Sequence, residues 1–402
     1  MLKKDNFFKN NFINLSKYNK NLEKTKKVFS SFIVDLKNNQ IPLLKSYEKN
    51  YEFDFSATTV KKFSKYRNIV VIGMGGSILG TKSIYSFLKK RIKKEVFFFD
   101  NLDLNLSLKY KKIKNLKNSC FIVVSKSGNT LETITNLGTI FSENLLKNKL
   151  IIITEITDNA LMAIANKYNA EIIEHKKFIC GRYSVLSETG MFPAALMGLN
   201  LMKFKNLKRL INNKNFISSL IQNVASIHTL NSKKINNSVI LNYDSSLNDL
   251  GYWYQQLVAE SLGKQGKGIN PILSFGPKYH HSLLQLYLDG PKDKFFTFFN
   301  SSKRENKLKV ARGIIPNNMG FLINKNLEFI INAQCNATKN IFKLKKIPFR
   351  QITFNKKNED ELGEIFTFFV LETILLSRLM NINPFDQPAV EQVKIETKRF
   401  LR

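Results

Sequence analysis

Short runs of consecutive apolar residues recur along the first half of the chain, and stretches of helical length separate them. Five runs stand out, at 68–73, 96–100, 121–125, 150–154 and 171–175. Their apolarity is continuous rather than alternating, which is typical of strands that are buried on both faces of a sheet. Strands that alternate with helices in this way predict βαβ units and a parallel sheet, in a first α/β domain spanning residues 51–200.

A second series of apolar runs follows, at 238–244, 271–276, 294–300 and 349–355. Helix-length segments again separate them, so the pattern predicts a second α/β domain over residues 201–380. The polar, helically spaced segment 198–235 is expected to connect the two domains. Residues 1–50 predict an N-terminal helical arm, and residues 381–402 predict a C-terminal loop and helix.

The overall composition fits a folded two-domain protein. Of its 402 residues 43% are hydrophobic, and the formal net charge is +32. Such a charge raises the possibility of a polyanionic partner. Lysine is scattered through nearly every segment, however, whereas a nucleic-acid-binding protein concentrates its basic residues on one element. We therefore expect no nucleic-acid partner, although the charge would help to attract a small anionic substrate.

The cysteines and the longest apolar segment indicate a cytoplasmic protein outside the membrane. Cys120, Cys180 and Cys335 are odd in number and lack CxxC spacing, so they predict neither a disulfide framework nor a zinc site. The N-terminus has no apolar core of a signal peptide. The most apolar helical segment is interrupted by Glu372 and Arg378, which excludes a membrane span of about 18 residues. We also find no metal-ligand cluster and expect no cofactor.

The first candidate site is the glycine-rich stretch 72–80, IGMGGSILG, which directly follows a predicted strand. Glycines allow a tight turn and a close approach of the backbone to an anion, and a helix N-terminus offers free N–H groups. The spacing differs from the G-x-G-x-x-G dinucleotide pattern. Taken alone, the stretch is either a ligand loop or simply a tight turn.

The second candidate is the loop SKSGNT, which follows the strand at 121–125. The hydroxyls of Ser125, Ser127 and Thr130 can point at one place, and Lys126 and Gly128 can supply backbone N–H groups, which suits a phosphate monoester. The alternative is ordinary helix capping, with Thr130 as the N-cap. Two such loops on adjacent parallel strands would meet at one edge of the sheet, which favours a phosphate site. A nucleophilic serine would need a nearby base such as histidine.

Three further stretches carry residues with catalytic potential. Arg182 lies in a loop that enters a helix, and Gln256 and Glu260 lie one helical turn apart, so they face the same way. The pair His280 and His281 precedes an amphipathic helix. Each of these residues, taken singly, is more often a surface charge or a helix cap.

Together these stretches resemble the glucose-6-phosphate isomerase family, the aldose–ketose isomerases of glycolysis and gluconeogenesis. The resemblance rests on six motifs in the family's order: GMGGSILG (73–80), SKSGNTLET (125–133), GRYSVLS (181–187), VAESLGKQGKG (258–268), HSLLQLYLDG (281–290) and NPFDQPAVEQVK (383–394). It implies two sugar isomerase (SIS) domains, each a doubly wound α/β unit. It also implies a cytoplasmic homodimer with a shared active site, which interconverts glucose 6-phosphate and fructose 6-phosphate without a cofactor.

The resemblance also assigns roles to individual residues. Glu260 would move the C2 proton to C1 through a cis-enediolate, which Arg182 would stabilise. His281, supplied by the partner subunit, would open the sugar ring, and Lys394 would contact the region of the ring oxygen. The substrate-binding residues would be Gly76, Ser77, Ser125, Lys126, Ser127, Thr130, Gln256 and Gln387.

Two departures from the family pattern are His280, where glutamine is usual, and Pro388, where a bulky aromatic residue is common. They bear on fine substrate contacts. The alternatives are a non-catalytic SIS-domain sensor of sugar phosphates and a dual enzyme that also acts on mannose 6-phosphate. A sensor would keep the serine loop but lack Glu260, Arg182 and Lys394, all of which are present.

Overall fold

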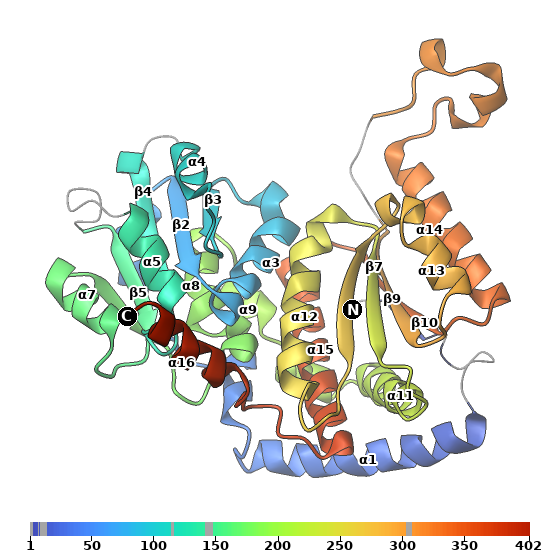
Figure 1. The fold of residues 1–402 in the computed structure, drawn as a ribbon, viewed down its shortest axis with the longest axis horizontal. Coiled ribbons are helices and arrows are strands. Elements are labelled where there is room, and N and C mark those ends of the chain that lie inside the picture. The colour runs from blue at the N-terminus through green and yellow to red at the C-terminus, as the bar shows by residue number, and fades with distance from the viewer. Residues whose placement is uncertain (1–2, 7, 9–13, 114–115, 141–147, 303–307) are drawn as a thin grey trace.

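Two five-stranded sheets form the centre of the molecule in the computed structural model, which describes residues 3–6, 8, 14–113, 116–140, 148–302 and 308–402 (Figure 1). The first sheet has the strand order β3-β2-β4-β5-β6 and is entirely parallel. Its strands are β2 (Asn68–Gly73), β3 (Glu95–Phe99), β4 (Ser119–Val124), β5 (Leu150–Thr154) and β6 (Glu171–Glu174). All five apolar runs predicted in this region are strands.

The second sheet has the order β1-β10-β9-β7-β8. Its strands are β1 (Lys3–Asn6), β7 (Asn237–Asn242), β8 (Asn270–Phe275), β9 (Lys294–Ser301) and β10 (Phe349–Phe354). The four predicted strands are parallel to one another, and β1 is added antiparallel to β10 at the sheet edge. The expectation that residues 1–50 form a purely helical arm was therefore incomplete, because the arm begins with a strand of the second sheet.

Helices cover both sheets and join them. The α-helices are α1 (Leu15–Lys37), α2 (Ala57–Ser64), α3 (Leu79–Leu88), α4 (Leu106–Lys111), α5 (Leu131–Ile140), α7 (Ala160–Tyr168), α8 (Glu188–Leu196), α9 (Leu201–Phe204), α10 (Leu207–Ile211), α11 (Lys214–Asn231), α12 (Asn248–Leu262), α13 (Leu284–Asp289), α14 (Leu327–Leu344), α15 (Glu359–Met380) and α16 (Val390–Phe400). Parallel sheets with helices packed on them confirm the predicted α/β fold. Among the helices of the described residues, none combines the length and apolarity needed to cross a membrane.

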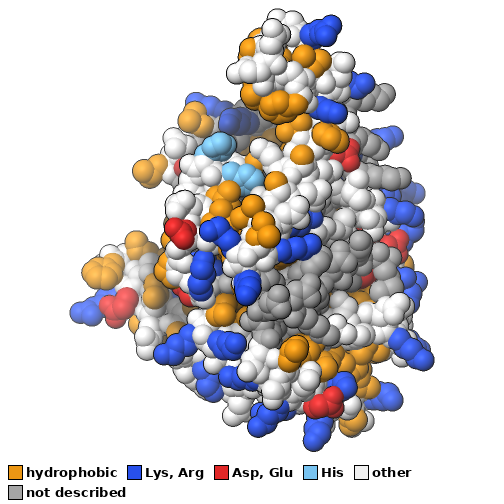
Figure 2. Space-filling view, turned by 90° about the vertical axis from the view of Figure 1, so that its right-hand side faces the viewer, with side chains coloured by type: hydrophobic (Ala, Val, Ile, Leu, Met, Phe, Trp, Pro, Cys, Tyr) orange, Lys and Arg blue, Asp and Glu red, His pale blue; other side chains and the backbone are white. Residues whose placement is uncertain are grey.

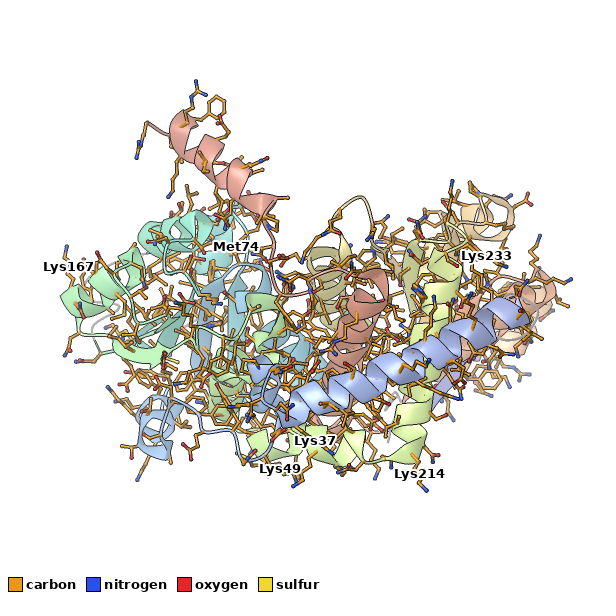
Figure 3. The ribbon with its side chains drawn as sticks, turned by 90° about the horizontal axis from the view of Figure 1, so that it is seen from below. Lys37, Lys49, Met74, Lys167, Lys214 and Lys233 are labelled. Carbon is orange, nitrogen blue, oxygen red and sulfur yellow. The ribbon has the colours of Figure 1, made fainter. Side chains whose placement is uncertain are left out.

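The two halves share one continuous core. A single cluster of buried apolar side chains includes residues of the first sheet, such as Ile69, and residues of α12 and α15, such as Trp253 and Phe366. The rings of Trp253 and Phe366 lie 4.7 Å apart, edge to face, and α12 also packs against α3 of the first half. On the underside, α1 runs along the second half and packs against α11 and α15 (Figures 1 and 3). This packing holds the carboxyl edge of the first sheet against α12.

Candidate active site

Two loops meet at the carboxyl edge of the first sheet, as the sequence predicts. Strands β2 and β4 are hydrogen-bonded neighbours, with Gly73 opposite Val124. After β2 the chain forms a short 3-10 turn, η2 (Gly75–Ser77), and then α3, whereas after β4 it forms the SKSGNT loop and then α5. Parallel strands thus bring Ser77 and the serine loop to the same edge.

The hydroxyls of the serine loop come together at its base. Ser125 is buried, and its Oγ lies 2.7 Å from Thr130 Oγ1. Gly128 has a φ of +66°, and a Cβ at this position would lie 1.9 Å from Asn159 Oδ1, so only glycine fits here. The Gly128 N–H donates to the Ser125 carbonyl at 3.1 Å. In the structure this N–H closes the turn of the loop.

The other two members of the loop differ in where their polar atoms lie. Ser127 is exposed, and its Oγ accepts a weak bond from the Asn129 N–H at 3.4 Å. The Lys126 ammonium donates to the Lys177 carbonyl at 2.8 Å and lies 3.6 Å from Glu155 Oε1. The partners of the Lys126 ammonium are therefore groups other than the hydroxyls of Ser125 and Thr130.

The glycine turn after β2 fits tightly against the other half of the site. A Cβ on Gly75, where φ is +51°, would lie 2.7 Å from Gln256 Nε2. A Cβ on Gly76 would lie 2.2 Å from the Gly181 carbonyl carbon. At Gly76 any other residue would push the backbone of Gly181 away, and at Gly75 the positive φ itself favours glycine. The two glycines therefore allow the first loop to lie directly against Arg182 and α12.

Arg182 and Glu260 form the centre of this second half. Arg182 NH1 donates to Glu260 Oε2 at 3.2 Å and to Gln387 Oε1 at 2.5 Å, and Gln256 Nε2 donates to Glu260 Oε1 at 2.9 Å. Gln256 and Glu260 do share one face of α12, as their spacing predicts. The structure therefore brings together four residues that the sequence analysis singled out from three separate motifs.

The Arg182 guanidinium group is buried and held by hydrogen bonds. The Arg182 side chain is 1% exposed and that of Glu260 is 29% exposed, so an accessible carboxylate lies beside a buried guanidinium group. Arg182 Nε donates to Ser261 Oγ at 2.9 Å, and Ser261 Oγ in turn lies 2.8 Å from the Tyr183 hydroxyl. Burial raises the pKa of Tyr183 to about 12, so this hydroxyl stays neutral.

A groove of about 560 Å³ separates the serine loop from α16. Figure 3 shows α16 standing off the first domain on the side where Met74, the residue after β2, lies. The groove is lined by Ser127, Asn129, Thr130, Leu131, Glu132, Val390, Glu391, Val393, Lys394, Ile395, Thr397 and Lys398. Its volume is large enough for a small phosphorylated ligand next to the hydroxyls of the serine loop.

Two predicted catalytic residues lie apart from the Arg182 cluster. Lys394 lies on α16, where its ammonium pairs with Glu391 Oε1 at 2.5 Å, and it faces the groove rather than Glu260. His281 is exposed in the turn η7 (Lys278–His281) of the second half, and within the described residues it has no hydrogen bond to Arg182 or Glu260. Figure 2 shows the outer face of the second half, with imidazole side chains at the surface near apolar and basic ones.

His280, one of the two departures from the family pattern, contacts two side chains of the second half. Its Nε2 lies 2.6 Å from the Tyr243 hydroxyl and 3.3 Å from Thr338 Oγ1. Burial lowers the pKa of His280, which favours the neutral ring in this contact. His280 therefore ties η7 to the end of β7 and to α14. The part of the chain that the structure describes contains no group of three or more His, Cys, Asp or Glu suited to a metal ion.

Sequence reasoning missed the residues that hold Arg182 in place. Ser261 accepts from Arg182 and also contacts the Tyr183 hydroxyl. The carbonyls of Pro384 and Asp386 accept from Arg182 NH2 at 2.5 and 3.0 Å. Ser261 directly follows Glu260 and Tyr183 directly follows Arg182, which is the only local signal. Their roles depend on contacts between segments far apart in the sequence.

Comparison with known proteins gives one consistent result. The phosphoglucose isomerase family profile matches residues 36–275, which include Arg182 and Glu260 but end before His281, Gln387 and Lys394. A glucose-6-phosphate isomerase of Methanocaldococcus jannaschii is 35% identical over 85% of this chain and 86% of its own length. Among solved structures, a hypothetical protein of Thermus thermophilus superposes with a TM-score of 0.83 at 21% identity, covering all of both chains. A glucose-6-phosphate isomerase of Chlamydia trachomatis superposes with a TM-score of 0.73 at 18% identity, covering 86% of this chain and 72% of its own.

Proposed function

The chain belongs to the phosphoglucose isomerase family, and from that premise we propose that it interconverts glucose 6-phosphate and fructose 6-phosphate as an aldose–ketose isomerase. The observation that carries the proposal is the contact between Arg182 and Glu260 at 3.2 Å, beside two loops at the carboxyl edge of the first sheet. A sensor of sugar phosphates would need the loops alone. An isomerase also needs a base and a fixed positive charge next to them.

Glu260 is the base in this proposal. The C2 proton of an open-chain aldose is weakly acidic, and one carboxylate can remove it and return it to C1 if water is kept away. Gln256 Nε2 donates to Glu260 Oε1 at 2.9 Å and so fixes the direction of the carboxylate. One oxygen of the carboxylate is thus oriented by Gln256 and the other by Arg182.

Arg182 stabilises the enediolate. Its guanidinium group supplies a fixed positive charge, and the burial of this group strengthens its interaction with a nearby negative charge. All five guanidinium N–H groups have acceptors in the structure, namely Ser261, Glu260, Gln387, Pro384 and Asp386. The enediolate oxygens must therefore replace one acceptor, and Gln387 is the best candidate because its side chain is neutral and exposed.

The phosphate group of the substrate binds at the two loops. Support comes from the paired hydroxyls of Ser125 and Thr130, from Ser127 in the groove wall and from Ser77 in the turn η2 that follows the neighbouring strand β2. Gly76 gives the backbone its close approach to Arg182. This leaves the serines as ligands of the phosphate, while the proton transfer takes place at Glu260. On α16, Lys394 faces the same groove and would contact the sugar.

We further propose a homodimer in which each active site takes His281 from the partner subunit. A cyclic hexose must open before proton transfer, and a histidine can carry the proton this requires. The exposed position of His281 on the second half supports its delivery to another copy. The three cysteines are free thiols, which suits work in the reducing cytoplasm.

The activity is tested with purified protein in the presence of a chelator, by following fructose 6-phosphate and glucose 6-phosphate in both directions. We expect Glu260→Gln to reduce kcat by at least about a hundredfold, since a general base contributes this much or more. Gln keeps the size of the side chain and its contact with Gln256. An inactive wild-type protein, or a fully active Glu260→Gln variant, contradicts the proposal. Mannose 6-phosphate in the same assay tests for the dual activity.

The shared site is tested by mixing two inactive variants. Glu260→Gln and His281→Ala dimers are unfolded, mixed and refolded together. If each site combines Glu260 of one subunit with His281 of the other, a mixed dimer contains one intact site, and the mixture regains about one quarter of wild-type activity. If both residues come from one subunit, mixing restores nothing.

A further inference from the structure

Three of the five acceptors of Arg182 come from one loop. The loop 381–387 follows α15, and it supplies the Pro384 carbonyl, the Asp386 carbonyl and Gln387 Oε1. The other two acceptors, Glu260 and Ser261, lie on α12. The orientation of the guanidinium group therefore depends on how the loop 381–387 is held relative to α12.

Lys264, just beyond the end of α12, holds this loop. Its ammonium donates to the Asn383 carbonyl and lies 2.7 Å from Asp386 Oδ1. Asn383 Nδ2 donates to the other oxygen of the same carboxylate at 3.0 Å, and the Phe385 N–H donates to Asn383 Oδ1 at 3.0 Å. Lys264 thus contacts the loop at two points, at Asn383 just before Pro384 and at Asp386, whose own carbonyl accepts from Arg182.

The electrostatics of this contact are favourable. The Lys264 side chain is only 12% exposed, whereas Asp386 is 52% exposed. The hydrogen bond from Lys264 is the main reason that the pKa of Asp386 is lowered, so the carboxylate stays ionised at neutral pH. A charged, partly buried hydrogen bond to a loop restricts it more than a neutral one does.

We propose that Lys264 is a positioning residue for the isomerisation: it fixes the loop 381–387 against α12 and thereby sets the position of the Arg182 guanidinium. This inference rests on the proposed function, because it assigns Lys264 to the same site. One segment of the chain then supplies Glu260, Ser261 and Lys264. The first two contact Arg182 directly, and the third acts through the loop on its other side.

The chain offers a matched control close to Lys264. Lys267 lies in the same turn after α12, and its ammonium donates to the Met380 carbonyl at 3.1 Å, at the end of α15. That carbonyl is not an acceptor of Arg182. Lys264→Met and Lys267→Met remove the same charge and the same kind of backbone contact, but only the first loosens the acceptors of the guanidinium.

The experiment measures kcat, KM and the kinetic isotope effect with glucose 6-phosphate deuterated at C2. We expect Lys264→Met to lower kcat by about ten- to a hundredfold with little change in KM, because a small misplacement of a catalytic charge costs this much. The isotope effect on kcat should rise, since proton transfer becomes slower than the other steps. Lys264→Arg should restore part of kcat, and Lys267→Met should retain wild-type kcat.

Three results separate the possibilities. An active wild-type protein with an equally active Lys264→Met variant overturns the positioning role, whereas an inactive wild-type protein overturns the proposed function. Equal losses in Lys264→Met and Lys267→Met also overturn the positioning role, since they indicate a general effect of the turn. If Lys264→Met does not fold, Asp386→Asn tests the same contact from the loop side and should lower kcat with the same rise in the isotope effect.

Discussion

The carboxyl edges of the two sheets offer the same kinds of side chains but use them differently. At the first edge, Ser125 and Thr130 pair with each other next to an open groove. At the second edge, serines and a lysine also follow parallel strands, with Ser246 after β7, Ser301 at the end of β9 and Lys357 after β10. From the fold alone, both edges could hold an anion.

The second edge already contains an anion, the carboxylate of Asp244. Ser301 Oγ donates to Asp244 Oδ2 at 2.5 Å, Ser246 Oγ donates to Oδ1 at 2.8 Å, and the Lys357 ammonium lies 2.8 Å from Oδ2. Burial alone would raise the pKa of Asp244, but Lys357 and the two hydroxyls outweigh it and lower the pKa to about 2. The carboxylate therefore stays ionised at neutral pH.

This difference indicates how one fold gives one edge to function and the other to stability. Hydroxyls that donate to an internal carboxylate cannot also donate to a phosphate, whereas those at the first edge can exchange their mutual bond for bonds to a ligand. Under the proposed function, Asp244 therefore keeps a substrate phosphate away from the donors at the second edge. The comparison fails if Asp244 affects substrate binding or if Ser125 does not.

The largest expected effect is on stability, from Asp244→Ala. Removal of one partner of a buried charge pair leaves Lys357, Ser246 and Ser301 without their shared acceptor, and we expect a loss of about 3 kcal/mol in the free energy of unfolding. Urea denaturation measures it. In the folded fraction KM should stay at the wild-type value, and a rise of KM would place Asp244 in the substrate site.

The next effect is on binding, from Ser125→Ala. A hydroxyl that donates to a phosphate dianion contributes about 1.5 to 3 kcal/mol, so KM should rise about ten- to a hundredfold while kcat changes less. Ser119→Ala, at the other end of the same strand β4, is the matched control and should leave KM unchanged. An unchanged KM in Ser125→Ala would remove the phosphate role of the loop.

The sequence pattern predicted the apolar strands of both sheets, but it missed the polar strand at the edge of the second sheet. All nine apolar runs are strands, because residues buried on both faces of a sheet must be apolar. The strand β1, with the sequence KKDN, has no apolar pattern, and only its pairing with β10 shows it. Hydrophobic patterning reports burial, so a polar edge strand gives no signal of this kind.

The candidate site shows the same limit. Motifs indicated Arg182, Gln256, Glu260 and Gln387, and the structure brings them together. The engagement of the Lys126 ammonium with Lys177 and Glu155, by contrast, depends on contacts among β4, β5 and β6 that no local pattern encodes. A motif can therefore predict which residues gather, but the direction of a long side chain depends on its neighbours in space.

A third effect concerns acid stability next to the serine loop. His175 follows β6, is 1% exposed, and its backbone N–H donates to the Thr154 carbonyl at 2.7 Å. Burial, together with the charge of Lys126, lowers the pKa of His175 to about 4. Because the unfolded chain takes up this proton near pH 6.5 and the folded chain does not, stability is lost as the pH falls from about 6.5 toward 4.

At pH 5 this one residue should cost about 2 kcal/mol of unfolding free energy relative to pH 7. Urea denaturation of the wild type and of His175→Gln at both pH values measures the difference, and the variant should lose less on acidification. Burial also lowers the pKa of His228. The pH dependence of stability in His228→Gln is therefore the comparison for His175→Gln. Equal pH dependence in the wild type and His175→Gln would contradict the assignment.

The smallest expected effect, from Lys126→Met, is the sharpest test of how the loop holds a phosphate. The ammonium is bound by the Lys177 carbonyl and lies near Glu155, and its side chain is 31% exposed, so its removal should change stability by less than about 1 kcal/mol. If the phosphate is held by hydroxyls and backbone N–H groups, KM should change by no more than about twofold, far less than in Ser125→Ala. A tenfold rise in KM would mean that the ammonium leaves Glu155 when substrate binds, and the first edge would then resemble the second, with a lysine and hydroxyls gathered around one anion.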